Sequence, residues 1–143
     1  MFESVGALRY TEIPSGSRHR RVLGWRLVVA VEPDLGAYYR SLIPKHMPTH
    51  CTRWPTHITV VRPFKERPPS LARTWRKYEG EIVTFSYDPE VRIDKTYYRL
   101  NVWCDRLVEI REELGLPAKS RWTLPPSGGH QCFHTTIANK KAN

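Results

Sequence analysis

The sequence predicts a single α+β domain over residues 1–143, made of two pseudo-symmetric lobes of antiparallel sheet that meet at a central cleft. The chain length is the usual size of one domain and is sufficient to bury a core. A hydrophobic content of 40% with 11% aromatic residues is typical of a globular protein. The order of elements also repeats. A strand, a helix and a strand with His-x-Thr occupy the first half, and strands, a helix and a second His-x-Thr strand occupy the second.

In the first half, the chain begins with a segment that we expect to be irregular, residues 1–22. A strand follows at residues 24–32, and its near-continuous apolar centre predicts burial on both faces and a central place in the sheet. A helix with apolar residues at helical spacing then runs over residues 35–43, where Pro44 stops it. The first motif strand covers residues 56–62.

In the second half, capping and turn residues set the bounds of the expected elements. Ser70 is an N-cap for a short helix that ends near Gly80. Asp94-Lys95 is the turn of a hairpin, and Asp105 caps an amphipathic helix closed by Gly115. The expected elements are a helix over 70–80, strands over 81–87, 91–93 and 96–104, a helix over 105–115, a loop over 117–129 and the second motif strand.

Two His-x-Thr motifs are the main functional signal. Random placement of 6 His and 11 Thr would give about 0.5 such matches, and three are present. The match at His50 lies between prolines and is interpreted as a loop. His57 with Thr59, and His134 with Thr136, lie in β-branched runs bounded by turn residues. In an extended strand, residues two apart share a face, so each motif offers one imidazole beside one hydroxyl.

This combination of groups is suited to phosphate ester chemistry without a metal or cofactor. Histidine titrates near neutral pH, so one imidazole can remove a proton while the other supplies one. Threonine hydroxyls can bind the non-bridging oxygens of a phosphate and hold the phosphorus in line. The motifs do not assign the base and the acid. The predicted catalytic residues, for opening or cleavage of phosphodiesters, are His57, Thr59, His134 and Thr136.

Basic and aromatic residues near the motifs are the expected substrate-binding residues. The basic side chains would favour the growing negative charge on the phosphate. Alternate residues of the strand over 96–104 form one face, which we expect to be a wall of the cleft where aromatic rings stack on nucleobases. The alternative is that these aromatic residues only pack beneath a helix or loop. The predicted substrate-binding residues are Arg62, Lys65, Tyr97, Arg99 and Trp103.

Composition also bears on partners and compartment. A net charge of +9 favours polyanions such as nucleotides or nucleic acid, although the same excess of Lys and Arg can serve only to solubilise a surface. The three cysteines lack the spacing of a disulfide framework, and we expect free thiols. No apolar run approaches the roughly 18 residues of a membrane span. The chain has no basic leader, so we expect a cytoplasmic protein with no membrane association and no obligate protein partner.

The motifs and the segments around them resemble the 2H phosphoesterase superfamily. The segments at residues 38–40, 57–62, 87–92 and 110–117 are similar to its tailed-phage branch, and the similarity extends from about Trp25 to Lys140. That branch includes the anti-CBASS phosphodiesterases, which degrade cyclic di- and trinucleotide messengers of bacterial antiphage defence. The loop over 122–129 is long for the branch, which predicts a reshaped pocket.

The resemblance carries specific implications for fold and substrate. It implies a bilobal 2H-like fold with helices on the outside and the motif strands at the central cleft. His57 and His134 would be the acid–base pair, and Thr59 and Thr136 the phosphate-binding hydroxyls. The substrates would be cyclic di- or trinucleotides or short RNA, cleaved at 3′,5′ linkages, and the compartment the cytoplasm of the bacterial host.

Three alternatives stay open. A zinc site would use alternate residues of the second motif strand, His130, Cys132 and His134, with help from His50 and Cys51, but this spacing does not match common zinc signatures. A second alternative keeps the enzyme and changes its substrate to a 2′,3′-cyclic phosphate or a 2′,5′-linked RNA. The third is a non-catalytic RNA-binding module, which the basic and aromatic residues fit equally well.

Overall fold

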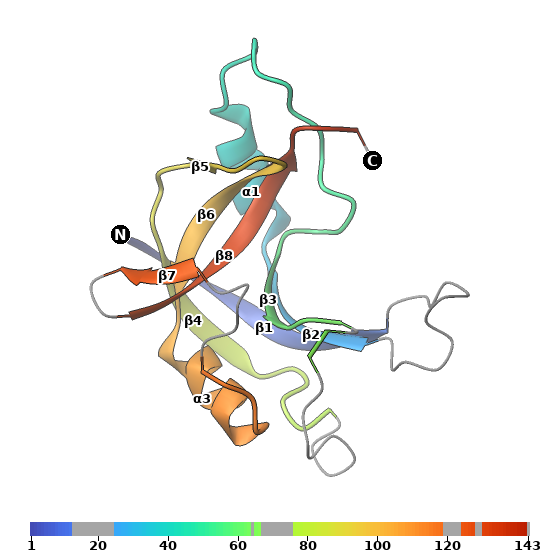
Figure 1. Cartoon of the computed structure of the whole chain (residues 1–143), viewed down its shortest axis with the longest axis vertical. Coiled ribbons are helices and arrows are strands. Elements are labelled where there is room, and N and C mark those ends of the chain that lie inside the picture. The colour runs from blue at the N-terminus through green and yellow to red at the C-terminus, as the bar shows by residue number, and fades with distance from the viewer. Residues whose placement is uncertain (13–24, 64, 67–75, 119–123, 128–129, 143) are drawn as a thin grey trace.

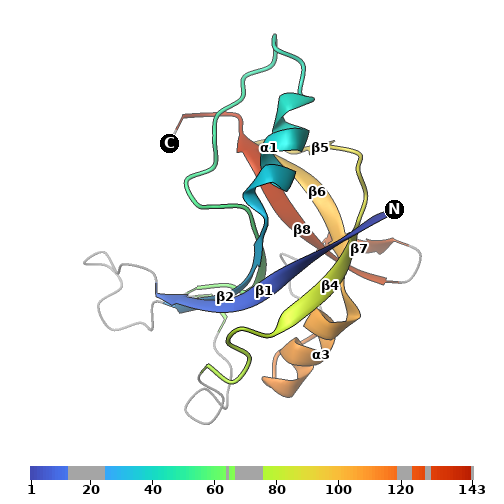
Figure 2. The same ribbon diagram turned by 180° about the vertical axis from the view of Figure 1, so that it is seen from behind.

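The computed structural model describes residues 1–12, 25–63, 65–66, 76–118, 124–127 and 130–142 of the chain. Strands dominate these residues, with two short helices at opposite ends of the strand assembly (Figures 1 and 2). The elements are β1 (Phe2–Glu12), β2 (Trp25–Val31), α1 (Pro33–Ser41), β3 (His57–Val61), β4 (Ile82–Tyr87), β5 (Arg92–Ile93), β6 (Tyr97–Trp103), α3 (Asp105–Glu113), β7 (Leu124–Ser127) and β8 (His130–Asn139).

The strands form one antiparallel sheet that closes on itself. Their order is β5-β6-β4-β1-β2-β3-β8-β7, and β6 also pairs with β8. The six strands β6-β4-β1-β2-β3-β8 therefore make a closed barrel, with β5 and β7 attached outside the ring. The predicted α+β fold of two lobes with a central cleft is wrong, because the sheet is continuous around the molecule and the helices are too few to cover two separate sheets.

The first strand is the main reason for this correction. Residues 1–22 were expected to be irregular, but β1 pairs with β2 from Gly6 to Glu12 and with β4 from Phe2 to Ala7. It thereby joins the first half of the chain to the second in one sheet. Gly6 lies where β1 and β2 approach closely, since a Cβ there would be 2.5 Å from a Val29 methyl carbon.

One apolar core lies inside the barrel and extends to the helices. Inward residues of the barrel strands pack with Tyr39 and Ile43 near α1 and with apolar residues of α3. Each fully buried aliphatic side chain contributes about 1.5–3 kcal/mol to folding. The side chains with no exposure at all include Leu8, Leu27, Val29, Val61, Ile58, Leu100, Val102, Leu107 and Ile110.

Most of the other predicted elements are confirmed within two residues. Strand β2 lies between β1 and β3, as expected for a central strand, although Ala30 is exposed and only one face is fully buried. The hairpin of β5 and β6 pairs Arg92 with Arg99. Helix α3 ends at Glu113, with Leu114 as its C-cap, and the next residue, Gly115, has a φ of 80° that suits glycine. Of the predicted helix over 70–80, residues 70–75 lie outside the described residues. Residues 76–80 form turns, so the prediction is wrong for the described part. The expected loop over 117–129 contains β7.

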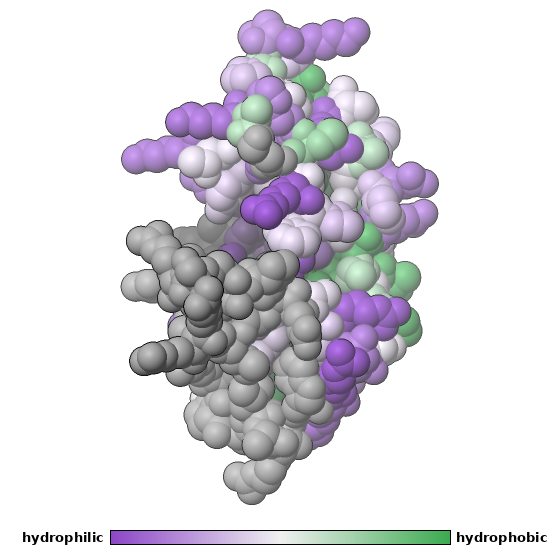
Figure 3. Space-filling view, turned by 90° about the vertical axis from the view of Figure 1, so that its right-hand side faces the viewer, coloured by the Kyte–Doolittle hydropathy of each residue, from purple (hydrophilic) through white to green (hydrophobic). Residues whose placement is uncertain are grey.

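Hydrophilic side chains cover most of the described surface in the view of Figure 3, with small hydrophobic areas between them. None of the helices in the described residues has the length and apolar composition needed to cross a membrane.

Candidate active site on the outer face of the barrel

The two motif strands are neighbours, and their register brings the four predicted catalytic residues together. Strands β3 and β8 are antiparallel, with Ile58 opposite Thr135. One step away in either direction, this register sets His57 opposite Thr136 and Thr59 opposite His134. All four side chains then lie on one face, and each imidazole has a hydroxyl beside it on its own strand and another across the ladder. We call His57, Thr59, His134 and Thr136 the His–Thr quartet.

The His–Thr quartet faces outward from the barrel. Ile58 and Thr135, which point the opposite way, are 0% and 1% exposed and contribute to the interior. Ala30 lies opposite both His57 on β3 and Ala7 on β1. Ala7 in turn lies opposite Ile82, whose side chain is 66% exposed. The site therefore lies on the outer face of a closed barrel, and the described residues do not form the two separate lobes between which a central cleft was expected.

A buried threonine links the two motif strands. Thr135 donates a hydrogen bond from Oγ1 to the backbone oxygen of His57, at 2.8 Å. This bond satisfies a hydroxyl that is almost fully buried and adds a second connection beside the only ladder pair recorded between β3 and β8 in the described residues. The sequence analysis did not single out Thr135, because its side chain lies on the face opposite to the motif.

One ring nitrogen of His57 is hydrogen-bonded to the backbone. Its Nδ1 lies 2.7 Å from the backbone oxygen of Pro55, and since a carbonyl only accepts, Nδ1 carries the proton of this bond. The other nitrogen, Nε2, is then free of a proton in the neutral ring. Burial lowers the pKa of His57, the Pro55 hydrogen bond raises it, and the positive charges of Arg26 and Arg62 lower it further. The net effect is a lowered pKa.

His134 has a different environment. Its ring stacks on Tyr97, with centroids 5.9 Å apart and planes 13° apart, and it makes no hydrogen bond within the described residues. Burial lowers its pKa to about 4, with further lowering from Arg62, Arg99 and His57 and a small opposing effect of Asp94. Each histidine is therefore neutral at pH 7 in the free protein, and the two are close enough for the charge of one to act on the other.

The loop after β3 carries two of the predicted substrate-binding residues. Arg62 is half-buried and acts electrostatically on both histidines, whereas Lys65 is exposed in the same loop. The backbone nitrogen of Arg62 donates to Glu66 Oε1 at 3.0 Å. Glu66 in turn is bound by Arg111 of α3, whose two terminal nitrogens lie 3.1 and 2.7 Å from its carboxylate oxygens. The carboxylate of Glu66, a residue of this loop, therefore holds the loop against α3.

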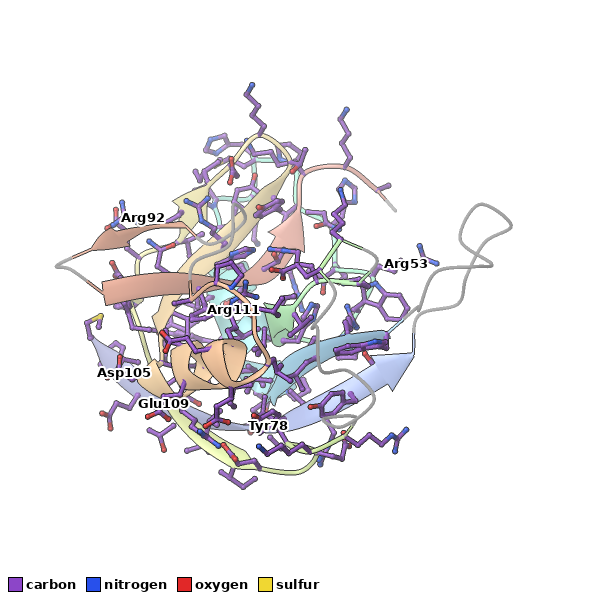
Figure 4. The ribbon with its side chains drawn as sticks, turned by 60° about the horizontal axis from the view of Figure 1, so that its bottom comes forward. Arg53, Tyr78, Arg92, Asp105, Glu109 and Arg111 are labelled. Atoms are coloured by element: carbon purple, nitrogen blue, oxygen red, sulfur yellow. The ribbon has the colours of Figure 1, made fainter. Side chains whose placement is uncertain are left out.

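Arg111 is the most informative residue that the sequence analysis missed. It is 1% exposed, and it also donates to the backbone oxygens of Val60 and Pro117 at 2.7 and 2.9 Å. Figure 4 shows its side chain on the side of α3 that faces the strands. Its position in the apolar stripe of the helix was the available signal, because a cation there needs a buried partner. Arg111 positions the Arg62 loop and belongs to the support of the site.

The outward face of β6 continues the site. Arg99 lies opposite Thr136 and Asn101 opposite His134, while Tyr97 stacks on His134. Exposure alternates along the strand as expected, with the other face fully buried. Arg99 forms an ion pair with Asp94 at 2.8 Å. Within the described part of the chain, three buried atoms on this face have no hydrogen-bond partner: Arg99 Nε, Asn101 Oδ1 and Trp103 Nε1. Unpaired buried polar atoms are uncommon in folded proteins, so the hydrogen bonding of this face is incomplete.

Two cavities flank the site along β6. One of about 270 Å³ touches Tyr97 and Asn139, and one of about 550 Å³ touches Trp103. Neither of these cavities, at the opposite ends of the strand, is lined by the histidines themselves. In the described part of the chain no three His, Cys, Asp or Glu residues are grouped to hold a metal ion, and the side chains of His130 and Cys132 lie outside it.

Comparison with known proteins identifies no relative. No protein-family model, curated protein or solved structure matches the chain. The resemblance to the 2H phosphoesterases therefore stays a hypothesis based on the two motifs and the segments around them.

Proposed function

We propose that this protein is a metal-independent phosphodiesterase of the 2H type that cleaves 3′,5′ linkages of cyclic di- or trinucleotides. One observation carries the proposal: the register of β3 and β8, which brings His57, Thr59, His134 and Thr136 to one face. Two imidazoles and two hydroxyls around one point are sufficient for general acid–base cleavage of a phosphodiester.

The proposed reaction uses each pair of residues in a separate role. The hydroxyls of Thr59 and Thr136 donate hydrogen bonds to the non-bridging oxygens and hold the phosphorus between the imidazoles. One imidazole removes the proton of the 2′-hydroxyl or of a water, whose oxygen attacks phosphorus. The other imidazole gives a proton to the oxygen that departs as the P–O bond breaks. Arg62 and Arg99 oppose the extra negative charge of the transition state.

We expect that substrate binding raises the pKa of the histidine that acts as the acid. Positive neighbours and burial keep both histidines neutral in the free protein. A bound phosphodiester brings a negative charge to the same place and offsets Arg62 and Arg99, which raises the pKa of each imidazole. The protonated form that the reaction needs is therefore favoured when the substrate is present.

The choice of substrate class follows from charge and from the resemblance. A chain with a net charge of +9 attracts polyanions, and the aromatic residues of β6 can stack on bases. The assignment of cyclic messengers of antiphage defence as substrates rests on the resemblance alone. The fold does not support it, because the described strands form a closed barrel. Under this proposal the protein serves a phage by removing the messenger from the host cytoplasm.

The proposal is tested by incubating the protein in EDTA with cyclic dinucleotides, cyclic trinucleotides and an RNA that ends in a 2′,3′-cyclic phosphate. We expect cleavage of at least one cyclic oligonucleotide, with products identified by mass spectrometry. If only the RNA end is cleaved, the substrate is the 2′,3′-cyclic phosphate and not a cyclic oligonucleotide. Activity that is lost in EDTA and restored by zinc would contradict the metal-free mechanism.

A matched set of variants separates catalysis from binding. His57→Ala and His134→Ala should each lower turnover by about 10²–10⁴-fold. His50→Ala, in the third His-x-Thr match, should retain it because His50 is exposed. RNA binding that persists in both variants, with no turnover by the wild type, would favour a non-catalytic RNA-binding module. A substrate with hydrogen in place of the 2′-hydroxyl identifies the nucleophile, since unchanged cleavage means attack by water.

A further inference from the structure

The cavity of about 550 Å³ lies at the Trp103 end of β6, on the same outward face as the His–Thr quartet. Its floor is a row of three residues on neighbouring strands, since Glu3 of β1 is opposite Ser86 of β4 and Ser86 is opposite Trp103. The volume falls in the range of small-molecule sites, roughly 300–1,000 Å³. The row gives this cavity an aromatic side, a hydroxyl and a carboxylate.

The charge of this cavity is opposite to that of the whole chain. Three of its lining side chains are carboxylates, Glu3, Asp88 and Asp105, and one is basic, Arg106. Asp88 is paired with Arg92 at 3.5 Å. Arg106 is already paired with Glu81 at 2.8 Å and with two glutamates of its own helix. Within the described residues Glu3 and Asp105 form no ion pair, and Figure 4 shows Asp105 at the start of α3. Such a cavity repels phosphate and favours a group that donates hydrogen bonds.

The cavity is placed one nucleotide away from the proposed reaction. Asn101 lies opposite His134, and Trp103 is two residues further along the same face, about 7 Å at the rise of an antiparallel strand. A sugar separates a phosphate from its base by a comparable span. A nucleotide whose phosphate meets His134 and Thr136 can therefore direct its base toward Trp103.

We propose that this cavity is a base-binding subsite that takes guanine, a proposal that rests on the proposed function. The Watson–Crick edge of guanine presents N1–H and the N2 amine side by side, and one carboxylate accepts both. Adenine presents a single amine there beside a ring acceptor, which would face the same carboxylate. Glu3 is the pairing group because it shares the floor with Trp103. The Trp103 ring lines the same cavity and offers a face on which the base can stack.

Equilibrium binding of three mononucleotides tests the subsite. GMP, IMP and AMP share the phosphate and ribose, and IMP lacks the N2 amine alone. By calorimetry we expect GMP to bind more tightly than IMP, and IMP more tightly than AMP, with about a tenfold loss at each step for a charge-assisted hydrogen bond. Glu3→Gln should weaken GMP by about tenfold and leave AMP unchanged. Glu112→Gln is the control, because Glu112 is exposed on α3 away from the cavity.

Turnover distinguishes the two proposals. A wild type that cleaves cyclic dinucleotides of guanine and adenine equally, or a Glu3→Gln variant with unchanged preference, would contradict the guanine subsite and leave the phosphodiesterase intact. Selective GMP binding with no cleavage of any substrate would contradict the phosphodiesterase and leave the guanine subsite intact. Trp103→Ala should weaken all three mononucleotides through lost stacking. Thermal unfolding shows whether Trp103→Ala still folds. If it does not, the Glu3→Gln variant, at an exposed position, still tests the guanine subsite.

Discussion

His57 and His134 share a motif, a face and a neighbourhood, but their surroundings differ. His57 is held by the carbonyl of Pro55 at Nδ1, and its own carbonyl accepts from Thr135. His134 stacks on Tyr97 beside Arg62 and Arg99, with no ring hydrogen bond in the described residues. An acceptor at the ring favours the imidazolium, whereas nearby cations favour the neutral base. The comparison teaches that the motif supplies two equal groups and the environment makes them unequal.

This inequality predicts the division of labour. When the pair holds one proton, we expect it to reside on His57, where the Pro55 carbonyl opposes the effect of burial. His134, with its pKa near 4, is then the neutral base. His57 would protonate the departing oxygen and His134 would activate the nucleophile.

The largest expected effect is the loss of either imidazole. His57→Ala and His134→Ala should each lower kcat by about 10²–10⁴-fold, the usual contribution of a general acid or base. A substrate with sulfur in place of the departing oxygen separates them, because a thiolate leaves without a proton. It should restore most of the rate to His57→Ala and little to His134→Ala, measured by single-turnover kinetics.

The contrary result is equally informative. Rescue of His134→Ala in place of His57→Ala would reverse the assignment. Equal rescue of both would mean that neither histidine acts as the dedicated acid. His46→Ala serves as the control, since His46 is exposed in the loop between α1 and β3.

The pH dependence of kcat/KM tests the same inequality with a smaller effect. The active form of the free protein carries a proton on one imidazole only. Activity should therefore rise as pH increases through about 4, where His134 loses its proton. It should fall again as His57 loses its proton, at a pH below its ordinary value of 6.5. An optimum above pH 7 would contradict this order.

The smallest effect concerns Arg62. Its charge is the second largest cause of the lowered pKa of His134, but among the smaller causes for His57. Arg62→Gln should thus raise the pKa of both histidines, with the greater rise at His134, in an NMR titration of the imidazole nitrogens. Lys65→Gln in the same loop is the matched control, and an equal rise in both histidines would contradict the geometry.

Local patterns in the sequence identified many elements of this site. The alternation of Tyr97, Arg99 and Trp103 with buried residues is a property of one strand, and so is the pairing of His57 with Thr59. Nonlocal contacts were harder to predict. Among its described side chains, strand β1 has only Leu8 and Tyr10 as large buried residues, and it owes its conformation to partners on both sides.

The same reason explains the missed supporting residues and the incorrect fold class. Arg111 has a role only because Glu66 and the Val60 carbonyl come within reach of α3. The repeat of strand, helix and motif strand is present in the chain order, but it contains no information about which strand edges pair. Closure depends on the pairing of β6 with both β4 and β8.

The junction between β3 and β8 gives the site a mechanical property. Among the described residues, β1 and β2 are joined by seven ladder pairs and β6 and β8 by six, whereas β3 and β8 are joined by the Ile58–Thr135 pair alone. Half of the His–Thr quartet lies on each side of this weak junction. A phosphate held by Thr59 and Thr136 would therefore act as a clamp across it, and binding would slow amide hydrogen exchange at Ile58 and Thr135 as well as raise the melting temperature.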